Sequence, residues 1–600
     1  MAYTTGPLYP CNPATARSES TKLGVDPKGE KLIYTNGRAV IIRDLHNPAL
    51  SHAYTQHTQT ATVARFSPSG YYAASADVAG NVRIWDVTQP TNNLKLAIRP
   101  LAGRINDLAW DGESKRIIVG GEGKDKFGAA FFMDSGSSCG EIAGHAKTIT
   151  ALSVRHQRPF RAVSGSDDNS VVLHTGVPFK YDKMISTHTR FVRDVAFSPN
   201  GDLFASVASD GKLFFYDGKD GTVKGEVERG GATNSLMACS WAPDSTKIAT
   251  AGADGVVSIW DASTMKSFQA YTVGSDLASQ QNGVVFANPA TLVSVSLSGV
   301  LNVFDTRESS TTKWRTLHGP TKAITASVLS SKEKTFYAGS FDGTIKKFDS
   351  EGVCEDVEGT GHSARIAGLA TSEEKVWSAG WDDKVSSMEN GCFSSTSLPT
   401  KAQPLGLAAT PQAVYVASSA GLEITPVGGT AVVAPGGSVS AVAAYPGPNG
   451  DIVAYGTGSK KVVLATVSGG QVSVLAEFED NRGQVFALAF SHDGNLLAAG
   501  DATGRIVLID MKEKKTLVSS KWTFHTGRIA SLSFSENNKR LASGGLDENI
   551  YVWEVEKTLK NTPIKNAHPG GVSAVAWTEG NHLISSGADG CVRTWTVKEV

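Results

Sequence analysis

Short apolar runs alternate with polar turns along almost the whole chain. A well-formed stretch contains a first run, "VRDVAFSP", a polar turn, "NGD", a second run, "LFASVAS", a tight turn, "DGK", and a third run, "LFFYD". Apolar and polar positions alternate with period two inside the runs, and small turn residues separate them, which is typical of β-strands joined in hairpins. Because helical periodicity is absent, the pattern predicts an all-β protein.

The pattern is also repeated. When the last apolar or aromatic position of each unit is used as a marker, successive markers lie 38 to 48 residues apart and define fourteen units. The markers are Arg43, Trp85, Met133, His174, Tyr216, Trp260, Phe304, Phe348, Met388, Ile509, Trp553 and Trp595, with two more near Pro426 and Thr466. This period and this strand pattern resemble the WD repeat of β-propellers.

Fourteen units are too many for one ring, because propellers close with about four to eight blades. We therefore predict two seven-bladed WD40 β-propellers in tandem, residues 16–316 and residues 317–600, with the weakest units around "GLEITP" and "VVLATV". Only five residues follow Trp595, which leaves the last blade without an outer strand and with an exposed edge. We expect residues 2–9 of the N-terminal segment 1–15 to supply that strand and to tie the two rings together.

Six histidines share one repeat position, and in the same units an aspartate lies six residues before the marker. The predicted pairs are His145 with Asp168, His188 with Asp210, His318 with Asp342, His362 with Asp382, His525 with Asp547, and His568 with Asp589. In WD repeats such a pair forms a hydrogen bond inside the blade, where a buried carboxylate needs a partner. This structural interpretation removes most of the residues from which a metal or catalytic site would be built.

Composition narrows the range of partners. With 57 basic and 58 acidic residues the net charge is −1, so the chain has no general field for nucleic acid or an anionic membrane. The six cysteines occur singly, without a C-x-x-C pair, which argues against a zinc site and a disulfide framework. No segment resembles a signal peptide or a membrane span, so we expect a cytoplasmic protein without cofactor or metal.

Enzyme motifs are absent in their required context. The Gly-rich stretch "GEGKDKFG" follows no βα unit and lacks the spacing of a phosphate-binding loop. No nucleophile elbow, zinc-binding helix or Cys-His constellation is present either. We therefore expect a recognition protein rather than an enzyme.

Three consecutive units of the predicted first propeller depart from the repeat. The inserted turn "GEGKDKFG" carries charges of both signs, "SGSDDNS" leaves one aspartate beside the structural one, and "VPFKYDK" and "THTRFVRD" add aromatic and basic residues. The candidate residues are Lys124, Asp125, Lys126, Asp167, Phe179, Lys180, Tyr181, Arg190 and Phe191. We expect them to lie in one region, and their mixture of charges suits a protein partner better than nucleic acid.

These stretches, together with "SPSGYYAASADVAGNVRIWD" and "WTFHTGRIASLSFS", resemble the actin-interacting protein one family from end to end. The resemblance implies a non-enzymatic monomer of the cytoplasm and its cortical actin structures. It also implies binding to actin filaments decorated with ADF/cofilin, faster disassembly of those filaments, and capping of barbed ends. The alternative is a general WD40 scaffold for a signalling or ubiquitin complex.

The resemblance also assigns roles to residues of the first propeller. By motif, the family's disassembly surface corresponds to Asp125, Asp167, Lys180, Tyr181 and Phe191, with Lys124, Lys126, Phe179 and Arg190 as flanking candidates. Asp125 stands where the family can have a longer Glu, and Tyr181 stands where it can have a Phe. The first ring is then expected to bind a surface made jointly by cofilin and actin, and the second ring to reach a neighbouring actin subunit.

Overall fold

The computed structural model describes residues 2–47, 50–89, 91–124, 126–227, 234–308, 312–330, 332–372, 375–427, 429–434, 436–448 and 450–598. These residues form fourteen four-stranded antiparallel sheets and one short 3-10 helix, η2 (Leu277–Ser279). The chain divides into two compact units, Asn12–Thr321 and Met1–Cys11 with Lys322–Val600. Each unit contains seven of the sheets, so the fold is two tandem seven-bladed propellers, as predicted.

The first propeller consists of seven consecutive blades, each with its strands in chain order from the inner to the outer edge. Its strands are β2 Gly24–Val25, β3 Lys31–Asn36, β4 Ala39–Asp44, β5 His52–Tyr54; β6 Ala61–Phe66, β7 Tyr72–Asp77, β8 Val82–Asp86, β9 Leu94–Ile98; β10 Ile105–Trp110, β11 Arg116–Gly121, β12 Gly128–Phe132, β13 Ser138–Gly140; β14 Ile149–Val154, β15 Arg161–Ser166, β16 Val171–Thr175, β17 Lys180–Ile185; β18 Val192–Phe197, β19 Leu203–Ala208, β20 Leu213–Asp217, β21 Val223–Val227; β22 Leu236–Trp241, β23 Lys247–Gly252, β24 Val256–Asp261, β25 Ser267–Thr272; and β26 Gln281–Asn288, β27 Thr291–Ser296, β28 Leu301–Asp305, β29 Arg315–Leu317.

The second propeller follows the same order, except that its last blade takes its outer strand from the N-terminus. Its strands are β30 Ile324–Ser330, β31 Thr335–Ser340, β32 Ile345–Phe348, β33 Cys354–Asp356; β34 Ile366–Ser372, β35 Lys375–Gly380, β36 Lys384–Glu389, β37 Cys392–Pro399; β38 Pro404–Ala409, β39 Ala413–Ser418, β40 Gly421–Pro426, β41 Val432–Ala434; β42 Val439–Tyr445, β43 Asp451–Thr457, β44 Val462–Ser468, β45 Gln471–Phe478; β46 Val485–Phe490, β47 Leu496–Asp501, β48 Ile506–Asp510, β49 Lys515–Trp522; β50 Ile529–Phe534, β51 Arg540–Gly545, β52 Ile550–Glu554, β53 Asn561–Ile564; and β54 Val572–Trp577, β55 His582–Gly587, β56 Val592–Val597, with β1 Tyr3–Tyr9.

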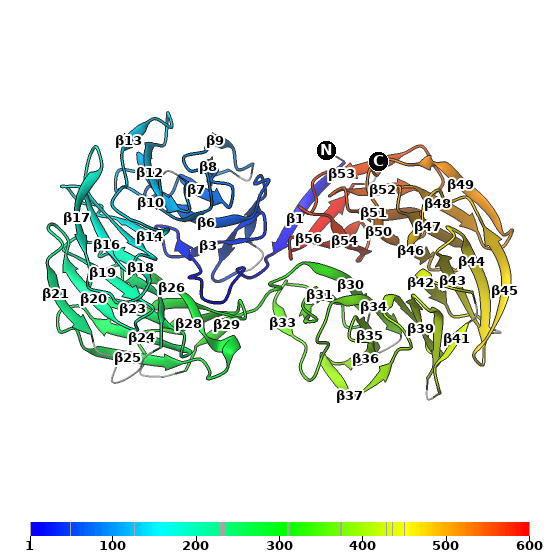
Figure 1. Ribbon diagram of the computed structural model, residues 1–600. Coiled ribbons are helices and arrows are strands. Elements are labelled where there is room, and N and C mark those ends of the chain that lie inside the picture. Colours follow the sequence, from blue (N-terminus) through cyan, green and yellow to red (C-terminus); the bar gives the residue numbers. More distant parts are fainter. Residues whose placement is uncertain are drawn as a thin grey trace. The chain divides into compact units, whose positions relative to one another are not determined.

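Both rings close through their inner strands. Successive inner strands pack side by side, and the ring is completed where β2 meets β26 in the first propeller and β30 meets β54 in the second. In the second propeller β1 pairs antiparallel with β56, with Tyr3 opposite Val597 and Tyr9 opposite Val592 (Figure 1). Tyr9 also stacks on Phe348 of the ring's first blade, with the ring centroids 6.1 Å apart. The predicted closing strand is confirmed, and it joins the last blade to the first.

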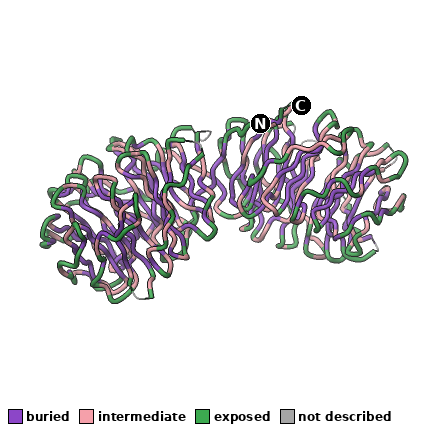
Figure 2. Tube along the Cα trace, turned by 90° about the horizontal axis from the view of Figure 1, so that it is seen from above, coloured by how far each residue is buried: buried purple, intermediate pink, exposed green. Residues whose placement is uncertain are grey.

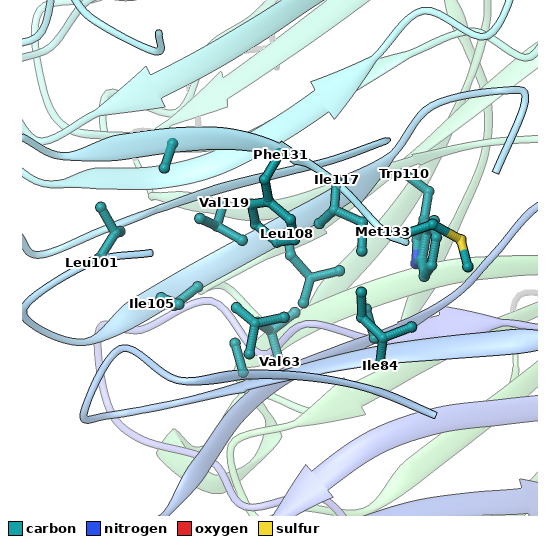
Figure 3. Packing of buried hydrophobic residues seen from close by; sticks show 14 residues of the cluster. Val63, Ile84, Leu101, Ile105, Leu108, Trp110, Ile117, Val119, Phe131 and Met133 are labelled. Atoms are coloured by element: carbon teal, nitrogen blue, oxygen red, sulfur yellow. The ribbon is translucent and has the colours of Figure 1, made fainter. Parts of the chain in front are cut away.

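The hydrophobic core lies between neighbouring blades, because the second strands of the blades, such as β7 and β11, are buried on both faces. One cluster joins Val63 and Ile84 of the second blade to Leu108, Val119 and Phe131 of the third (Figure 3). Buried residues fill the interior of the blades, whereas exposed residues gather in the turns (Figure 2) and along outer strands such as β9 and β17. The blades are therefore a rigid support from which the loops project.

Buried hydrogen-bond networks hold the blades together internally. Five of the predicted pairs are confirmed, with Nδ1 of His145, His188, His362, His525 and His568 at 2.8 to 3.0 Å from Asp168, Asp210, Asp382, Asp547 and Asp589. In each network the histidine Nε2 forms a hydrogen bond with a serine hydroxyl of the blade's second strand. His318 and Asp342 fall in different units, so their pair stays a prediction.

A further network, which the sequence analysis missed, joins His57 to Asp77 at 3.4 Å. Asp77 is the last residue of its strand β7, whereas the predicted aspartates lie in the turn that follows the second strand. Because of this offset, a search that uses one fixed spacing between the aspartate and the marker residue does not find the pair.

His174 stands at a marker position where other blades have a tryptophan, yet it keeps the hydrogen bond that tryptophan makes there. Its Nε2 lies 3.0 Å from the hydroxyl of Ser164, as the indole N–H groups of Trp553 and Trp595 donate to Ser543 and Ser585 in their blades. His174 is fully buried, and burial lowers its pKa to about 3. The blade is therefore intact despite the altered residue.

Two blades of the second propeller, one of them the blade with the weak "GLEITP" unit, use other carboxylates in place of the His–Asp pair. Glu423 of β40 is buried and accepts hydrogen bonds from the N–H groups of Lys401 and Ala402 at 2.8 and 3.0 Å. Asp501 at the end of β47 accepts from the N–H groups of Arg482 and Gly483. In both blades a buried carboxylate holds the loop that enters the inner strand, so the histidine is dispensable.

The segment before β2 brings one buried ammonium group between inner strands of the first propeller. Nζ of Lys22 lies 2.7 Å from Asp194 of β18 and 3.4 Å from Asp107 of β10, and all three side chains are nearly inaccessible. Burial lowers the pKa of Lys22, but the two carboxylates raise it, and the net pKa lies above its ordinary value. The ammonium group therefore stays charged and neutralises two buried carboxylates.

We predict that Lys22→Met destabilises the first propeller by about 3–5 kcal/mol, because it leaves the buried carboxylate of Asp194 without a counterion and that of Asp107 with Arg65 alone, at 3.3 Å. Lys28→Met is the matched control, since Lys28 is exposed. The free energy of unfolding would be measured by urea titration followed by circular dichroism. Equal unfolding midpoints for the two variants would show that the buried ammonium group is unimportant.

A second prediction concerns pH. The pKa of His174 is about 3 in the folded chain and about 6.5 in the unfolded chain, so below pH 6.5 only the unfolded state takes up a proton here. Stability is therefore lost as the pH falls, by about 2 kcal/mol at pH 5 from this residue alone. In His174→Tyr, which copies Tyr216 of the next blade, the loss between pH 7 and pH 5 should be smaller by that amount. An unchanged pH dependence of the urea midpoint would contradict this account.

Candidate functional site

Asp167 and Phe191 lie at the same end of two neighbouring blades of the first propeller. Asp167 directly follows β15, and its N–H donates to the carbonyl of Thr148 at 3.1 Å. Phe191 directly precedes β18, and its carbonyl accepts from the N–H of Ser209 at 2.9 Å. Because these two bonds occupy equivalent repeat positions, both residues lie where the loops enter the inner strands.

Two basic residues bring Asp167 and Phe191 into one cluster. Nζ of Lys147 lies 6.0 Å from the centroid of the Phe191 ring, and the guanidinium carbon of Arg193 lies 5.5 Å from it. Burial raises the pKa of Asp167, whereas the charges of Arg193 and Lys147 lower it. We call Lys147, Asp167, Phe191 and Arg193 the Phe191 cluster.

Arg193 reaches this position through a β-bulge. Val192 pairs with Ala208 and Asp194 pairs with Val207, so Arg193 is the extra residue between them. A bulge turns its side chain away from the regular alternation of the strand. The Nε–H of Arg193 donates to the hydroxyl of Ser209 at 2.7 Å, which fixes the side chain over the loop.

The Phe191 cluster offers a mixed surface to a partner. The Phe191 side chain is 43% exposed, and exposed aromatic rings beside basic groups are typical of binding hot spots. Oδ1 of Asp167 is buried and has no hydrogen-bond partner among the described residues. This oxygen departs from the usual pattern, because buried polar atoms are normally hydrogen-bonded.

Lys180 and Tyr181 lie elsewhere on the same blade. Lys180 pairs with Thr175, which pairs with Arg161 at the start of β15, whereas Asp167 follows the end of β15. The register separates the two ends by about 16 Å along the strand. The expectation of a single region is therefore wrong in this respect.

Tyr181 is nevertheless held in place. Its ring packs against Gly144, where a Cβ atom would lie 2.6 Å from the tyrosine Cδ2. Gly144 has φ +109°, a conformation that side chains rarely adopt, so the glycine leaves room for the ring. Tyr181 remains 49% exposed on the outer strand, and Lys180 beside it is exposed too.

Phe179 belongs to the core rather than to this surface. It is fully buried in a cluster with Ile142, and its N–H donates to the carbonyl of Cys139 at 2.9 Å. Its proposed flanking role is therefore corrected.

The other flanking candidates lie at the surface. Lys124, Lys126 and Arg190 are exposed, and Lys126 lines a cleft of about 510 Å³ beside Arg99 and Glu141. Asp125 lies outside the described residues.

Sequence reasoning missed Lys147 and Arg193. The available signal was the residue at the bulge, which is Thr62 in the second blade and Thr150 in the fourth. These two hydroxyls donate to carbonyls of the next blade, Ile105 and Val192. Arg193 stands where those blades have a threonine that bonds to the next blade. The change of residue type therefore indicates that this position does not serve that structural bond.

Within the described part of the chain, no group of three His, Cys, Asp or Glu side chains is arranged to hold a metal ion. The described residues contain no helix of the length and apolar character that a membrane crossing needs.

Comparisons with known proteins agree with the repeat analysis. The family model for the WD domain, G-beta repeat, matches residues 49–86, 179–217, 226–261, 311–349 and 560–596. The model for the anaphase-promoting complex subunit 4 WD40 domain matches residues 447–537.

Full-length relatives are also found. Actin-interacting protein 1 of Drosophila melanogaster is 35% identical over 605 residues, covering 100% of this chain and 99% of that protein. WD repeat-containing protein 1 of Gallus gallus is 35% identical, with 100% and 99% covered. The 66 kDa stress protein of Physarum polycephalum is 36% identical, with 100% of both chains covered.

The structure predicts that replacing two phenylalanines only twelve residues apart has very different effects on stability. Phe179→Ala should lower the free energy of unfolding by about 3–5 kcal/mol, because it leaves a cavity in the core. Phe191→Ala should change it by about 0.5 kcal/mol or less, as expected of a surface position. Urea titration of both variants checks this, and similar losses of stability would show that Phe191 has a core role.

Proposed function

Because the chain belongs to the actin-interacting protein 1 family, we propose that it is an actin-binding protein that acts on filaments decorated with ADF/cofilin. It promotes disassembly of these filaments and caps their barbed ends. The observation that carries this proposal is full-length similarity to a protein named for its interaction with actin, together with the exposed Phe191 cluster. It acts by recognition and without catalysis, as a monomer, in the cytoplasm at cortical actin structures.

The first propeller supplies the recognition surface in this proposal. The Phe191 cluster presents one exposed ring, two cations and the partly exposed carboxylate group of Asp167. Lys180 and Tyr181 present a second contact at the other end of the blade. Since the register separates the two groups, we infer that they bind different parts of the partner surface, one on actin and one on cofilin. Lys124 and Lys126, between β11 and β12, extend the first group in this proposal, and Asp125 stays a candidate contact by resemblance alone.

Two separated contacts explain preference for the decorated filament. In this proposal a bare filament contacts only one of the two groups, whereas a surface made jointly by actin and cofilin contacts both. Binding can shift the filament towards a distorted, severable state only through stronger binding to that state. Rigid blades help, because residues that are already ordered lose little entropy on binding. Capping is assigned to the second propeller, which in this proposal reaches a neighbouring actin subunit.

A filament-pelleting assay tests the proposal. The full chain should leave bare actin in the pellet and should release actin to the supernatant when cofilin is present. Phe191→Ala and the pair Lys180→Ala with Tyr181→Ala should each weaken this effect about tenfold or more, because an aromatic hot spot contributes roughly 2 kcal/mol or more. Arg158→Ala, an exposed position on the same blade, is the control.

The outcomes discriminate between functions. Equal release with and without cofilin would contradict the proposed mechanism. Absence of any effect on actin, with a folded chain, would favour the general WD40 scaffold instead. Unfolding of the Lys180 and Tyr181 variant, seen as a lower melting temperature, would assign these residues a structural role.

A further inference from the structure

The second propeller carries two arginines at one mouth of its central channel, and no function described above uses them. The channel has a volume of about 590 Å³ and is lined by the inner strands. Arg365 directly precedes β34, and its carbonyl accepts from the N–H of Trp381 at 2.9 Å. Arg528 directly precedes β50, and its carbonyl accepts from the N–H of Leu546 at 2.9 Å. These equivalent repeat positions place both arginines at the same end of the channel.

Neither guanidinium group is neutralised. Both arginines are half-buried, each Nε lacks a hydrogen-bond partner, and neither side chain forms an ion pair with a residue that the structure describes. Arg365 lies 4.7 Å from the ring centroid of Trp381, and Arg528 lies 4.5 Å from that of Phe486. Burial lowers the pKa of both, and the charge of Arg365 lowers that of Arg528 further. Both cations line the same channel.

The rim around them is apolar. Phe341, Trp381, Leu405 and Leu546 are exposed large apolar residues that line the same channel. No Asp or Glu is among the described residues that line it. Exposed apolar groups gathered around unpaired charges are typical of an interaction site rather than of a solvated surface.

Bulge positions contribute to this rim. Leu405 is the extra residue between the pairs Pro404–Ser418 and Gly406–Ala417, and Phe486 holds the equivalent position in β46. At the same position in other blades, the hydroxyls of Thr325 and Ser440 donate to carbonyls of the next blade at 2.6 Å. Leu405 and Phe486 lack that structural bond, and their side chains are available to a ligand instead.

The first propeller shows how such an arginine is satisfied. Arg104 occupies the same repeat position, because its carbonyl accepts from the N–H of Glu122 after the second strand of its blade. Its guanidinium pairs with the carboxylate of Glu19 at 2.7 Å. An arginine at this position can therefore pair with a carboxylate. No described residue supplies such a carboxylate to Arg365 or Arg528.

We propose that this mouth of the second propeller binds an extended acidic segment of a partner protein, in which carboxylate side chains flank an apolar one. Arginine matches a carboxylate with two parallel hydrogen bonds, and the aromatic rim receives the apolar side chain. The channel volume is typical of a ligand pocket, about 300–1,000 Å³. A nucleic acid would need a longer basic groove than two cations provide. The proposal goes beyond the actin proposal and does not depend on it.

Peptide selection on the full chain tests this inference. A random peptide library displayed on phage is selected on the wild-type chain and on the variant with Arg365→Gln and Arg528→Gln. The wild-type chain should enrich peptides with Asp or Glu beside an aromatic or aliphatic residue, and the variant should lose that enrichment. No enrichment, enrichment of peptides without acidic residues, or equal enrichment on both chains would each overturn the proposal.

Affinity measurements complete the test. A labelled peptide from the selection should bind at least tenfold more weakly, by fluorescence anisotropy, to either single variant and to Trp381→Ala. Replacing its acidic residues with the amides should have the same effect. Arg104→Gln is the matched control and should bind like the wild type. Because the two guanidinium groups bond to no described residue, the Gln variants should keep the wild-type melting temperature; a lower one would assign them a structural role and overturn the proposal.

Discussion

The first propeller depends on one buried ammonium group. Lys22 neutralises Asp107 and Asp194, and these two carboxylates also accept hydrogen bonds from the N–H groups of Leu152 in β14 and Cys239 in β22. The same segment bonds β26 through the carbonyl of Asn282 and continues directly into β2. A single short segment thus organises inner strands all around the ring, and the positions of the loops follow from it.

The two propellers use equivalent positions for different purposes. In the first, the segment that carries Lys22 also supplies Glu19, which pairs with Arg104. The loops one blade further on then carry the Phe191 cluster, where Lys147 and Arg193 have an aromatic ring and a carboxylate beside them. In the second, Arg365 and Arg528 have aromatic rings but no carboxylate. Equivalent backbone positions therefore carry different side chains in the two propellers, and we propose a different partner for each.

The repeat pattern was sufficient to predict the blades, five His–Asp pairs and the closing strand β1, because these depend on local alternation and spacing. It was insufficient for Lys22 and Arg193, since a lone basic residue carries no signal until the ring brings distant strands together. The placement of Lys180 and Tyr181 failed for another reason. Sequence order puts them close to Asp167, but the hairpin register carries them to the opposite end of the blade.

The central claim is that the Phe191 cluster is a contact surface for actin filaments carrying ADF/cofilin. A cryo-electron microscopy reconstruction of the full chain bound to such filaments tests it most directly. The account predicts that Phe191 is buried against actin or cofilin, with Asp167 accepting a hydrogen bond from the partner and Tyr181 at a separate contact. A bound chain whose Phe191 cluster faces solvent would contradict it.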